Sequence, residues 1–486
     1  MNILPVSMSV AMLLSSSLAA APFDTCPSKA YLFQSQPVQV YGVNLVTGET
    51  QLLQGDTGSS ANINAVGFDE ADRYIYGYDT SNKQIVRLGQ DFQVEPVNTS
   101  NLPQDHTFYV GDVINHIFYL YRQGKGLFKI DLSPLDSDPN ALLVVEKITS
   151  RAVVSLTDFA FHPGNGKLYG VDNGSGFLYE FDIANGQETL VGDTGQKGTF
   201  GAGYFDRDGY FYVSRNADVM SNGVVIREGG KIYRIDLSLA NSNLDSGDVL
   251  AVEFADGPSS NQNDGARCAK APVIDEDSTI DFGDAPASYG TLLSDNGPRH
   301  QLDGITWLGL TVVDGDQDGA ISPISDDTLG VDDEDGIGFV TAIAPGLDSR
   351  VTAYASTSGY LSAWIDWGGD GEFNDPQDKI FSDYPLEAGQ NILFVEAPIT
   401  ALGGDSWGRF RFSQQTGLDA DGGSTSGEVE DHPVTISDAN TRHQHFPSST
   451  GYVTLAYEDS YPYTADYDMN DVVMFLRVTE TYKGRC

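Results

Sequence analysis

The sequence predicts an all-β protein in which an N-terminal β-propeller of about five blades precedes an antiparallel β-sandwich. Short alternating apolar stretches recur between residues 30 and 268, and no stretch shows the sustained periodicity of a helix. A chain of 486 residues, 40% of them hydrophobic, is long enough for about two to four packed domains. The expected division is a signal peptide (1–20), a propeller (26–268), a linker (269–280), a sandwich (281–437) and a last segment (438–486).

The propeller prediction rests on a repeated unit of three or four short strands. A weaker copy lies at 109–132, and the three clearest copies are 65–69 with 74–78 and 84–88, 158–161 with 167–171 and 177–182, and 202–206 with 210–213 and 231–236. One such unit cannot bury both of its faces, so we expect the units to stack radially as blades. An open β-solenoid is the alternative.

The two ends of the first region are expected to share one blade. Residues 31–53 read as a unit that lacks its first strand, and residues 264–268 could supply that strand. This closure would bring Cys26 close to Cys268, so we expect a disulfide between them, with Cys486 left over. This disulfide would distinguish a propeller from an open solenoid, because the two ends of a solenoid lie far apart.

The second region reads as a sandwich of antiparallel sheets. Alternating strands at 360–365, 391–395 and 408–412 are separated by turns rich in glycine, aspartate and proline.

Acidic clusters in this region predict structural calcium. Between residues 275 and 339 sixteen acids face one arginine, and glycines let neighbouring carboxylates turn toward one cation. The candidate ligands are Asp314, Asp316, Asp318, Asp332, Asp333, Asp335, Asp366, Asp370, Glu372 and Asp375. The alternative is a solvated surface of an acidic, salt-adapted protein.

Two further acids pose the same question on a strand. Glu428 and Glu430 are two residues apart and share one face, where unpaired carboxylates repel each other. They require either a cation or an arginine, and Arg409 and Arg411 are the arginine candidates.

The charge and the N-terminus narrow the setting. A net charge of −42 disfavours nucleic acid and anionic lipid as partners. The apolar run in residues 10–14, followed by small residues, is typical of a secretory signal peptide, and no later stretch is long enough for a transmembrane helix. We expect a protein that is soluble outside the cytoplasm.

Several motifs resemble known families. The segments 281–291, 297–300, 332–336, 363–372, 409–412 and 427–431 together resemble the GEVED domain of bacterial secreted and surface proteins. Residues 456–459 and 466–473 are similar to the opening of an LruC domain of Gram-negative surface proteins, which is incomplete here, and the N-terminal repeats resemble the propeller-like region that often precedes such modules. The resemblance implies a modular exported protein, secreted or at the cell surface or in the periplasm, that is used for display, adhesion or matrix contact and has no established catalytic activity. The resemblance identifies no ligand, and we expect the partner to be an extracellular protein or a glycan.

An enzyme remains the alternative function. The sequence has no GxSxG, HExxH or phosphate-loop motif, and His106, His116 and His162 read as turn or packing residues. A hydrolase or lyase acting on carbohydrate would instead need a cluster of acids or histidines at the mouth of the propeller channel.

Overall fold

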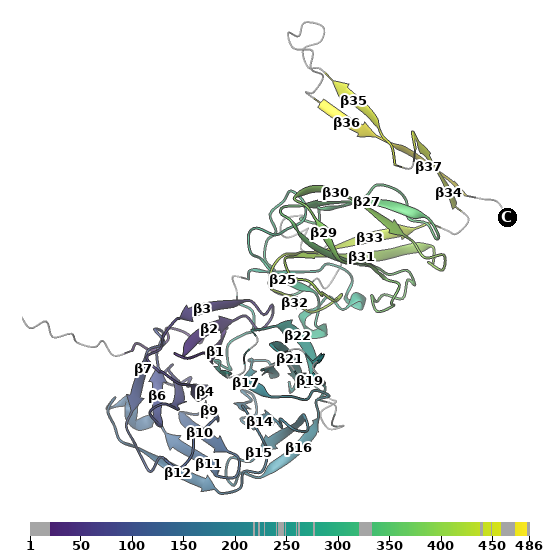
Figure 1. Ribbon diagram of the computed structural model, residues 1–486. Helices are drawn as coiled ribbons and strands as arrows, with labels where there is room; N and C mark the ends of the chain where they lie inside the picture. The colour runs from purple at the N-terminus through teal and green to yellow at the C-terminus, as the bar shows by residue number, and fades with distance from the viewer. Residues whose placement is uncertain are drawn as a thin grey trace, which may run out of the picture.

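The computed structural model describes residues 20–483 apart from several gaps, and its regular structure is nearly all strand. The gaps are 217–218, 222–223, 228, 240, 242–246, 248, 259, 261–262, 276–277, 320–332, 438–440, 449 and 458–471. Figure 1 shows a ring of small sheets in the N-terminal half, followed by a sandwich and a long hairpin. The predicted all-β class is confirmed. The described residues form no helix with the length and apolarity needed to span a membrane.

The ring is a propeller with five blades in the described part of the chain, each built on four antiparallel strands. From the inner strand outward, the closing blade contains β23 (Asn263–Ala266), β1 (Ala30–Gln34), β2 (Gln39–Val43) and β3 (Thr50–Gln54), and the second blade contains β4 (Ile63–Phe68), β5 (Ile75–Asp79), β6 (Gln84–Leu88) and β7 (Val94–Val97). The third blade contains β9 (Val110–Ile114), β10 (Ile117–Arg122), β11 (Gly126–Asp131) and β12 (Leu143–Thr149), and the fourth contains β13 (Ala160–Phe161), β14 (Leu168–Val171), β15 (Phe177–Phe181) and β16 (Glu188–Asp193). The fifth blade contains β17 (Phe200–Phe205), β18 (Tyr210–Arg215), β21 (Lys231–Asp236) and β22 (Val252–Asp256). The inner strands contact one another in a closed ring, which excludes the solenoid.

Smaller elements decorate the blades. The short strand β8 (Thr99–Ser100) pairs in parallel with β12, and β19 (Val219–Ser221) pairs with β20 (Val224–Arg227) in a separate hairpin. A 3-10 turn, η1 (Ser133–Asp136), follows β11.

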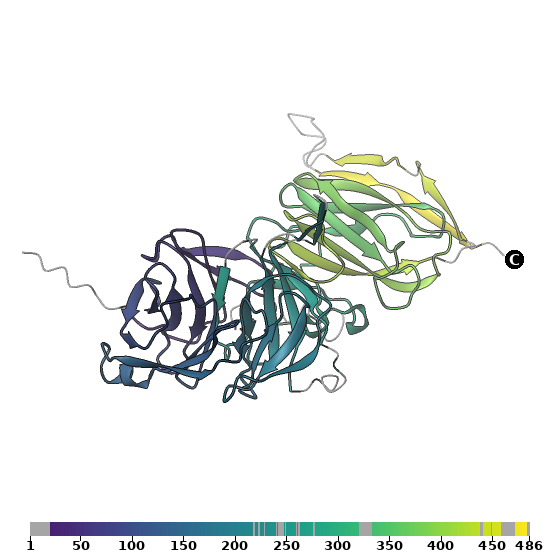
Figure 2. The same cartoon turned by 60° about the horizontal axis from the view of Figure 1, so that its bottom comes forward.

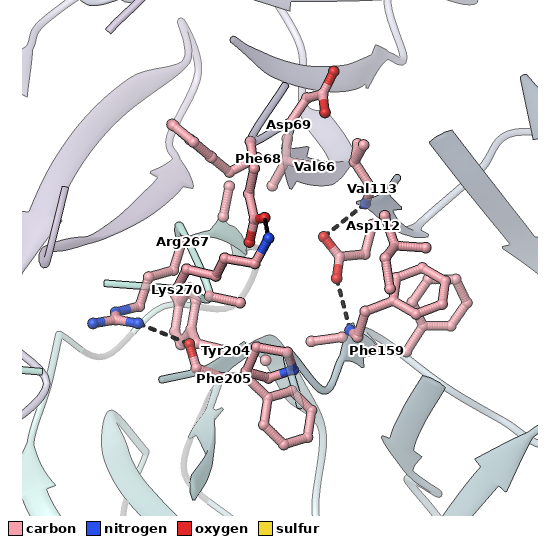
Figure 3. A pocket seen from close by; sticks show the side chains of 18 of the residues that line it. Val66, Phe68, Asp69, Asp112, Val113, Phe159, Tyr204, Phe205, Arg267 and Lys270 are labelled. Carbon is pink, nitrogen blue, oxygen red and sulfur yellow. Dashed lines mark hydrogen bonds and ion pairs between the residues drawn. The ribbon is translucent and has the colours of Figure 1, made fainter. Parts of the chain in front are cut away.

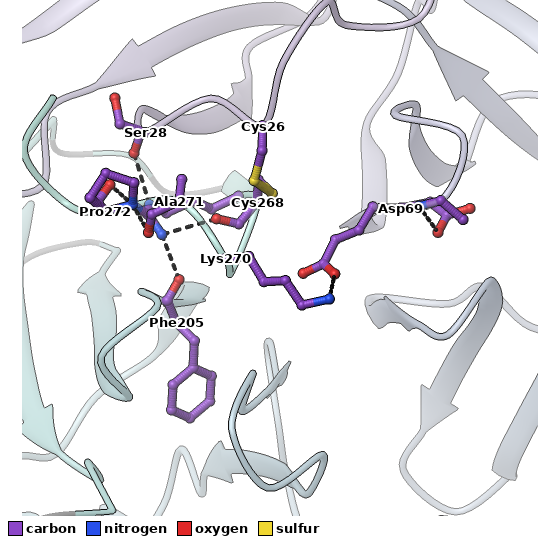
Figure 4. Close-up of a disulfide and its surroundings, with 11 residues drawn as sticks. Cys26, Ser28, Asp69, Phe205, Cys268, Lys270, Ala271 and Pro272 are labelled. Carbon is purple, nitrogen blue, oxygen red and sulfur yellow. Dashed lines mark hydrogen bonds and ion pairs between the residues drawn. A yellow bond between two sulfur atoms is a disulfide. The ribbon is translucent and has the colours of Figure 1, made fainter. Parts of the chain in front are cut away.

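The ring closes by mixing the two ends of the domain in one blade, as predicted. Strand β23 pairs with β1, with Tyr31 opposite Ala266. The disulfide joins Cys26 to Cys268 beside this ladder (Figure 4). The Arg267 guanidinium is buried between them and donates to five backbone carbonyl oxygens, those of Ser28, Phe205, Cys268, Ala271 and Pro272. The bridge joins the two ends of the domain within the closing blade, and this arginine links that blade to Phe205 at the end of β17 in its neighbour.

The second domain is a sandwich of two antiparallel sheets with a small mixed sheet at one end. One layer contains β26 (Ile337–Phe339), β27 (Asp348–Ala355) and β30 (Gly389–Glu396), and the other contains β29 (Lys379–Leu386), β28 (Gly359–Ile365), β31 (Gly404–Ser413) and β33 (Glu428–Ile436). Apolar side chains from both layers form one core. The small sheet contains β24 (Ile280–Phe282), β25 (Arg299–Gln301) and β32 (Gly423–Ser424), and its β25–β32 pair is parallel. The 3-10 turns η3 (Ala287–Tyr289) and η4 (Leu293–Asp295) lie between β24 and β25.

The two domains meet at the small sheet, and β22 of the propeller contacts β32 (Figures 1 and 2). Phe254 on β22 lies between two guanidiniums, with Arg234 at 4.3 Å and Arg299 at 3.9 Å from its ring centre. Arg299 is fully buried and also donates to the carbonyl oxygens of Val46 and Phe254 in the propeller. Arg234 donates in return to carbonyl oxygens of η4. The two domains are therefore joined by two arginines, each of which donates hydrogen bonds to backbone carbonyl oxygens of the other domain.

The last described segment is a two-part hairpin. Strand β34 (Thr441–Phe446) pairs with β37 (Val478–Lys483), and β35 (Val453–Tyr457) pairs with β36 (Val472–Leu476). Some sequence predictions fall outside the described residues: the signal peptide up to residue 19, the proposed ligand Asp332, residues 458–459 and 466–471 of the LruC-like motifs, and the leftover Cys486.

Candidate functional site

Strand β33 carries a polar row on the face that points into the sandwich. Glu428 lies opposite Phe412 and Glu430 opposite Phe410 in the ladder with β31, and both phenylalanines belong to the core. Residues directly opposite in an antiparallel pair share a face, so the two glutamates also point inward. Each is only 1% exposed. Further along the same row His432 follows, and Val434 and Ile436 complete it as core residues.

Few donors reach these two glutamates. The Leu308 N–H donates to Oε2 of Glu428, and the Gly336 N–H donates to Oε1 of Glu430 at 2.7 Å. The other oxygen of Glu430 lies 2.9 Å from Nε2 of His432, which is also 3.6 Å from Oε2 of Glu334. One ligand atom each from Glu334, Glu430 and His432 lies within 4.8 Å of the others.

More acids surround this row and repel one another. The sandwich acidic cluster, as we name it, comprises Asp281, Asp284, Asp316, Asp333, Glu334, Glu428 and Glu430. Burial, and then the charges of neighbouring carboxylates, raise the pKa of three members well above the usual range: those neighbours are chiefly Asp316 for Asp281, and Glu430 for both Glu334 and Glu428. Such a group of inward carboxylates requires protons or a cation.

The expected arginine partners bind elsewhere. Arg409 forms a two-bond pair with Asp431, both at 2.8 Å. Arg411 donates to Nε2 of His300 and to backbone carbonyl oxygens of the 419–422 loop. The register explains this outcome, because Arg409 lies opposite Asp431 and Arg411 opposite Val429, on the face that points away from the core. The hypothesis that either arginine neutralises Glu428 and Glu430 was therefore wrong.

The predicted calcium ligands between residues 314 and 335 have different partners in the structure. Asp316 and Asp333 are near Asp281, and Asp333 also accepts from the Asp314 N–H at 3.3 Å. Asp318 and Asp335 instead accept backbone N–H groups of nearby loops, Asp318 from Leu293 at 2.6 Å and Asp335 from Leu310 at 2.9 Å.

The 366–375 loop is organised by its first aspartate. The carboxylate of Asp366 is fully buried and accepts from the N–H groups of Gly369 and Gly371 and from the Tyr289 hydroxyl. The other proposed ligands of this loop, Asp370, Glu372 and Asp375, are exposed. Sequence reasoning did not select Asp378, whose buried carboxylate accepts from the Trp367 and Asp375 N–H groups and whose pKa burial raises to about 6.

Three further acids lie on the inner ring of the propeller, two of them buried and Asp112 half-buried. We name Asp112, Asp158 and Asp264 the axial aspartates. Each accepts a hydrogen bond from the inner strand of the next blade, and these links run from Asp264 to the Ala65 N–H, from Asp112 to the Phe161 N–H at 2.8 Å and from Asp158 to the Gly203 N–H at 2.7 Å. Burial raises the pKa of Asp158 and Asp264 well above the usual range and that of Asp112 to about 7.

A cavity of about 300 Å³ opens beside these aspartates (Figure 3). Aromatic and aliphatic side chains line it together with Asp69, Asp112, His116 and Lys270. His116 contacts Oδ2 of Asp69 through Nδ1, and Lys270 pairs with Glu70. Burial lowers the pKa of His116, but the hydrogen bond and charge of Asp69 outweigh this effect and the pKa is raised. Sequence reasoning had assigned His116 to packing, because its partner lies 47 residues away in the preceding blade.

The structure thus defines a modular β-protein in which a closed five-bladed propeller is docked on a sandwich with an acidic interior. Residues 30–270 match the family described as a repeat of unknown function (DUF6923), and residues 360–435 match the GEVED domain family. The GEVED resemblance is therefore confirmed, over a shorter range than the expected 281–437. No curated protein matches the chain.

Several solved structures are similar over part of the chain. A protein of unknown function from Bacteroides thetaiotaomicron has 10% identity and a TM-score of 0.31, with 46% of this chain and 57% of that chain covered. A nidogen/laminin complex has 14% identity and a TM-score of 0.29, covering 42% and 73%. The β-propeller domain of Cps50 (Swd1) from Myceliophteria thermophila has 11% identity and a TM-score of 0.28, covering 49% and 73%. Likeness at this level carries no argument about function.

Proposed function

We propose that this protein is a secreted or surface-associated, non-catalytic binding or adhesion protein of a Gram-negative bacterium, and that calcium bound by the sandwich acidic cluster stabilises it. The modular propeller and GEVED domain favour a binding role, and the disulfide is typical of proteins outside the cytoplasm. Its partner would be an extracellular protein or a glycan, since the net charge of −42 disfavours polyanions.

The observation that carries the calcium proposal is the inward row of Glu428 and Glu430. Both are buried, neither pairs with an arginine among the residues that the structure describes, and Glu334 and Asp281 add further negative charge. Carboxylate oxygens are the ligands that calcium prefers, and a bound cation would relieve the repulsion without protonation. Asp316 and Asp333, which the sequence predicted, would complete the ligand set.

Thermal unfolding of the full chain tests this proposal. A ligand that binds only the folded state stabilises it by about 4 kcal/mol at a concentration 1,000-fold above its Kd. For a domain of this size we expect excess chelator to lower the melting temperature of the sandwich by about 10 °C. Equal melting temperatures in calcium and in chelator would contradict the hypothesis of structural calcium. A calcium-dependent screen against glycans and matrix proteins would then test the binding role separately.

A hydrolase or lyase acting on carbohydrate is the second candidate, and one observation favours it. The His116–Asp69 pair beside the 300 Å³ cavity is the kind of acid and histidine cluster that an enzyme would need at the channel mouth. Cleavage of any member of a polysaccharide panel by the full chain, lost in His116→Gln, would support an enzyme. Absence of turnover with retained glycan binding would support the binding protein.

A further inference from the structure

Two turns of neighbouring blades bring a second group of potential metal ligands together. Asp69 and Asp72 lie in the turn between β4 and β5, and His116 lies in the two-residue turn between β9 and β10. One ligand atom from each of the three lies within 4.8 Å of the others. We call these three residues the turn cluster, and two of them, Asp69 and His116, line the propeller cavity.

The imidazole of His116 is buried and fixed in this group. The residue is 9% exposed, and a left-handed backbone with φ of 63° directs the turn over the neighbouring blade. Its Nδ1 faces Oδ2 of Asp69, while its Nε2 has no hydrogen-bond partner among the described residues. The nearest carboxylate oxygen to Nε2 is Oδ1 of Asp136, at 3.4 Å.

The carboxylates are oriented by their own turn. The second oxygen of Asp69 accepts from the Ala71 N–H at 3.1 Å, and Asp72 accepts from the Tyr74 N–H at 3.1 Å and from the Tyr76 hydroxyl. Lys270, which lies in the same cavity, pairs with Glu70 instead of either aspartate. The two acids therefore face the imidazole with positions already set.

From this geometry we propose that Asp69, Asp72 and His116 bind a divalent transition-metal ion of the zinc class at the mouth of the propeller cavity. Two carboxylates and one imidazole are a ligand set that zinc accepts. Three protein ligands leave a coordination position for water or an anionic ligand from the cavity. Calcium prefers oxygen ligands only, so the imidazole separates this site from the calcium proposed in the sandwich.

Zinc titration of the chelator-stripped full chain tests the proposal. The His432→Gln variant serves as the background, because Glu334, Glu430 and His432 form the other histidine-containing group among the described residues. In that background we expect zinc to bind, and His116→Gln to weaken this binding at least tenfold. His162→Gln is the matched control: this buried propeller histidine donates to the Leu237 carbonyl oxygen at 3.0 Å and lies outside the cluster, so zinc affinity should not change.

Asp72→Asn provides a second variant if His116→Gln does not fold, since Asp72 is less buried than His116 and keeps an oxygen for Tyr74. Visible absorption of bound cobalt(II) in the unmodified chain provides an independent readout. Unchanged zinc affinity in both variants, or no zinc binding by the His432→Gln background, would overturn the proposal. His116 would then be only a histidine that pairs with Asp69. The calcium-dependent melting shift of the sandwich is unaffected by either result.

Discussion

The propeller and the sandwich both bury carboxylates, but they satisfy them differently. Each of the axial aspartates Asp112 and Asp158 accepts one N–H from its own chain neighbour and one from the next blade, at 2.7–2.8 Å. Glu428 and Glu430 accept one backbone N–H each and face other acids across the core. Aspartate has a short side chain that stays close to the backbone, whereas glutamate on a core-facing strand extends to where backbone donors are few.

The difference shows that a buried acid is not by itself a sign of a cation. What distinguishes the two regions is the number of N–H groups from which each carboxylate accepts a hydrogen bond. The axial aspartates are spread over three blades and act as links between inner strands. The sandwich acidic cluster gathers seven acids, so the stability of the sandwich should depend on calcium, while the axial aspartates should need no ion.

The largest expected effect comes from removing charge in the sandwich. Glu428→Gln combined with Glu430→Gln should abolish most of the calcium-dependent stabilisation, about 4 kcal/mol at saturating calcium, while raising stability in chelator because the repulsion is gone. Calorimetric melting with and without calcium measures both. The exposed Glu396→Gln is the control, and a double variant with a full calcium shift would contradict the assignment of the site.

Removing an axial aspartate should lower the free energy of unfolding by somewhat less than the calcium-dependent stabilisation of the sandwich. This loss should not depend on calcium. Asp158→Ala leaves the buried Phe159 and Gly203 N–H groups without acceptors, for an expected loss of about 3 kcal/mol in the propeller. Denaturant unfolding in calcium and in chelator should give equal losses. A loss that appears only in chelator would mean that the axial aspartates also depend on an ion.

The fold was predictable because its evidence is repeated along the chain. The strand unit recurs, so errors in single strands do not change the propeller prediction, and the incomplete first unit indicated both the closing strand and the Cys26–Cys268 bridge. The shared face of Glu428 and Glu430 was equally readable from the two-residue period. That neither glutamate has an arginine partner in the described part of the chain was not readable, because it depends on the register that sets Arg409 opposite Asp431.

The turn cluster could not be found in the sequence for a related reason. Asp69 and His116 lie in turns of different blades, and neither turn carries a recognisable ligand spacing. Asp69 and Asp206 each follow the inner strand of their blade. Only in the structure does one copy face a histidine, while the other accepts the Tyr212 hydroxyl at 3.0 Å.

The pH dependence of the propeller offers a test of intermediate size. Burial raises the pKa of Asp112 to about 7, above the value of about 3.9 in an unfolded chain, so the folded state holds a proton between these pH values. Its contribution to stability is therefore complete below about pH 4 and is lost as the pH rises to about 7. Asp112→Asn should reduce the change in the free energy of unfolding between pH 4 and pH 7 by about 2 kcal/mol. This is less than the whole change in the pKa of Asp112 would give, because its side chain borders the cavity. An unchanged slope between pH 4 and 7.5, relative to the exposed control Asp193→Asn, would contradict the raised pKa.

The smallest effect is expected in the 366–375 loop, where the two modes of satisfying a carboxylate occur side by side. Asp366 is buried and already accepts loop N–H groups, like an axial aspartate, whereas Asp370 and Asp375 are exposed acids that water can solvate. Asp370→Asn combined with Asp375→Asn should change the free energy of unfolding in chelator by less than about 0.5 kcal/mol. If this loop adds a calcium ion, as the sequence predicts, calorimetric titration should show one weak equivalent fewer than in the unmodified chain. An unchanged stoichiometry would restrict calcium to the sandwich acidic cluster, and the loop would then be held without an ion by the hydrogen bonds that Asp366 accepts.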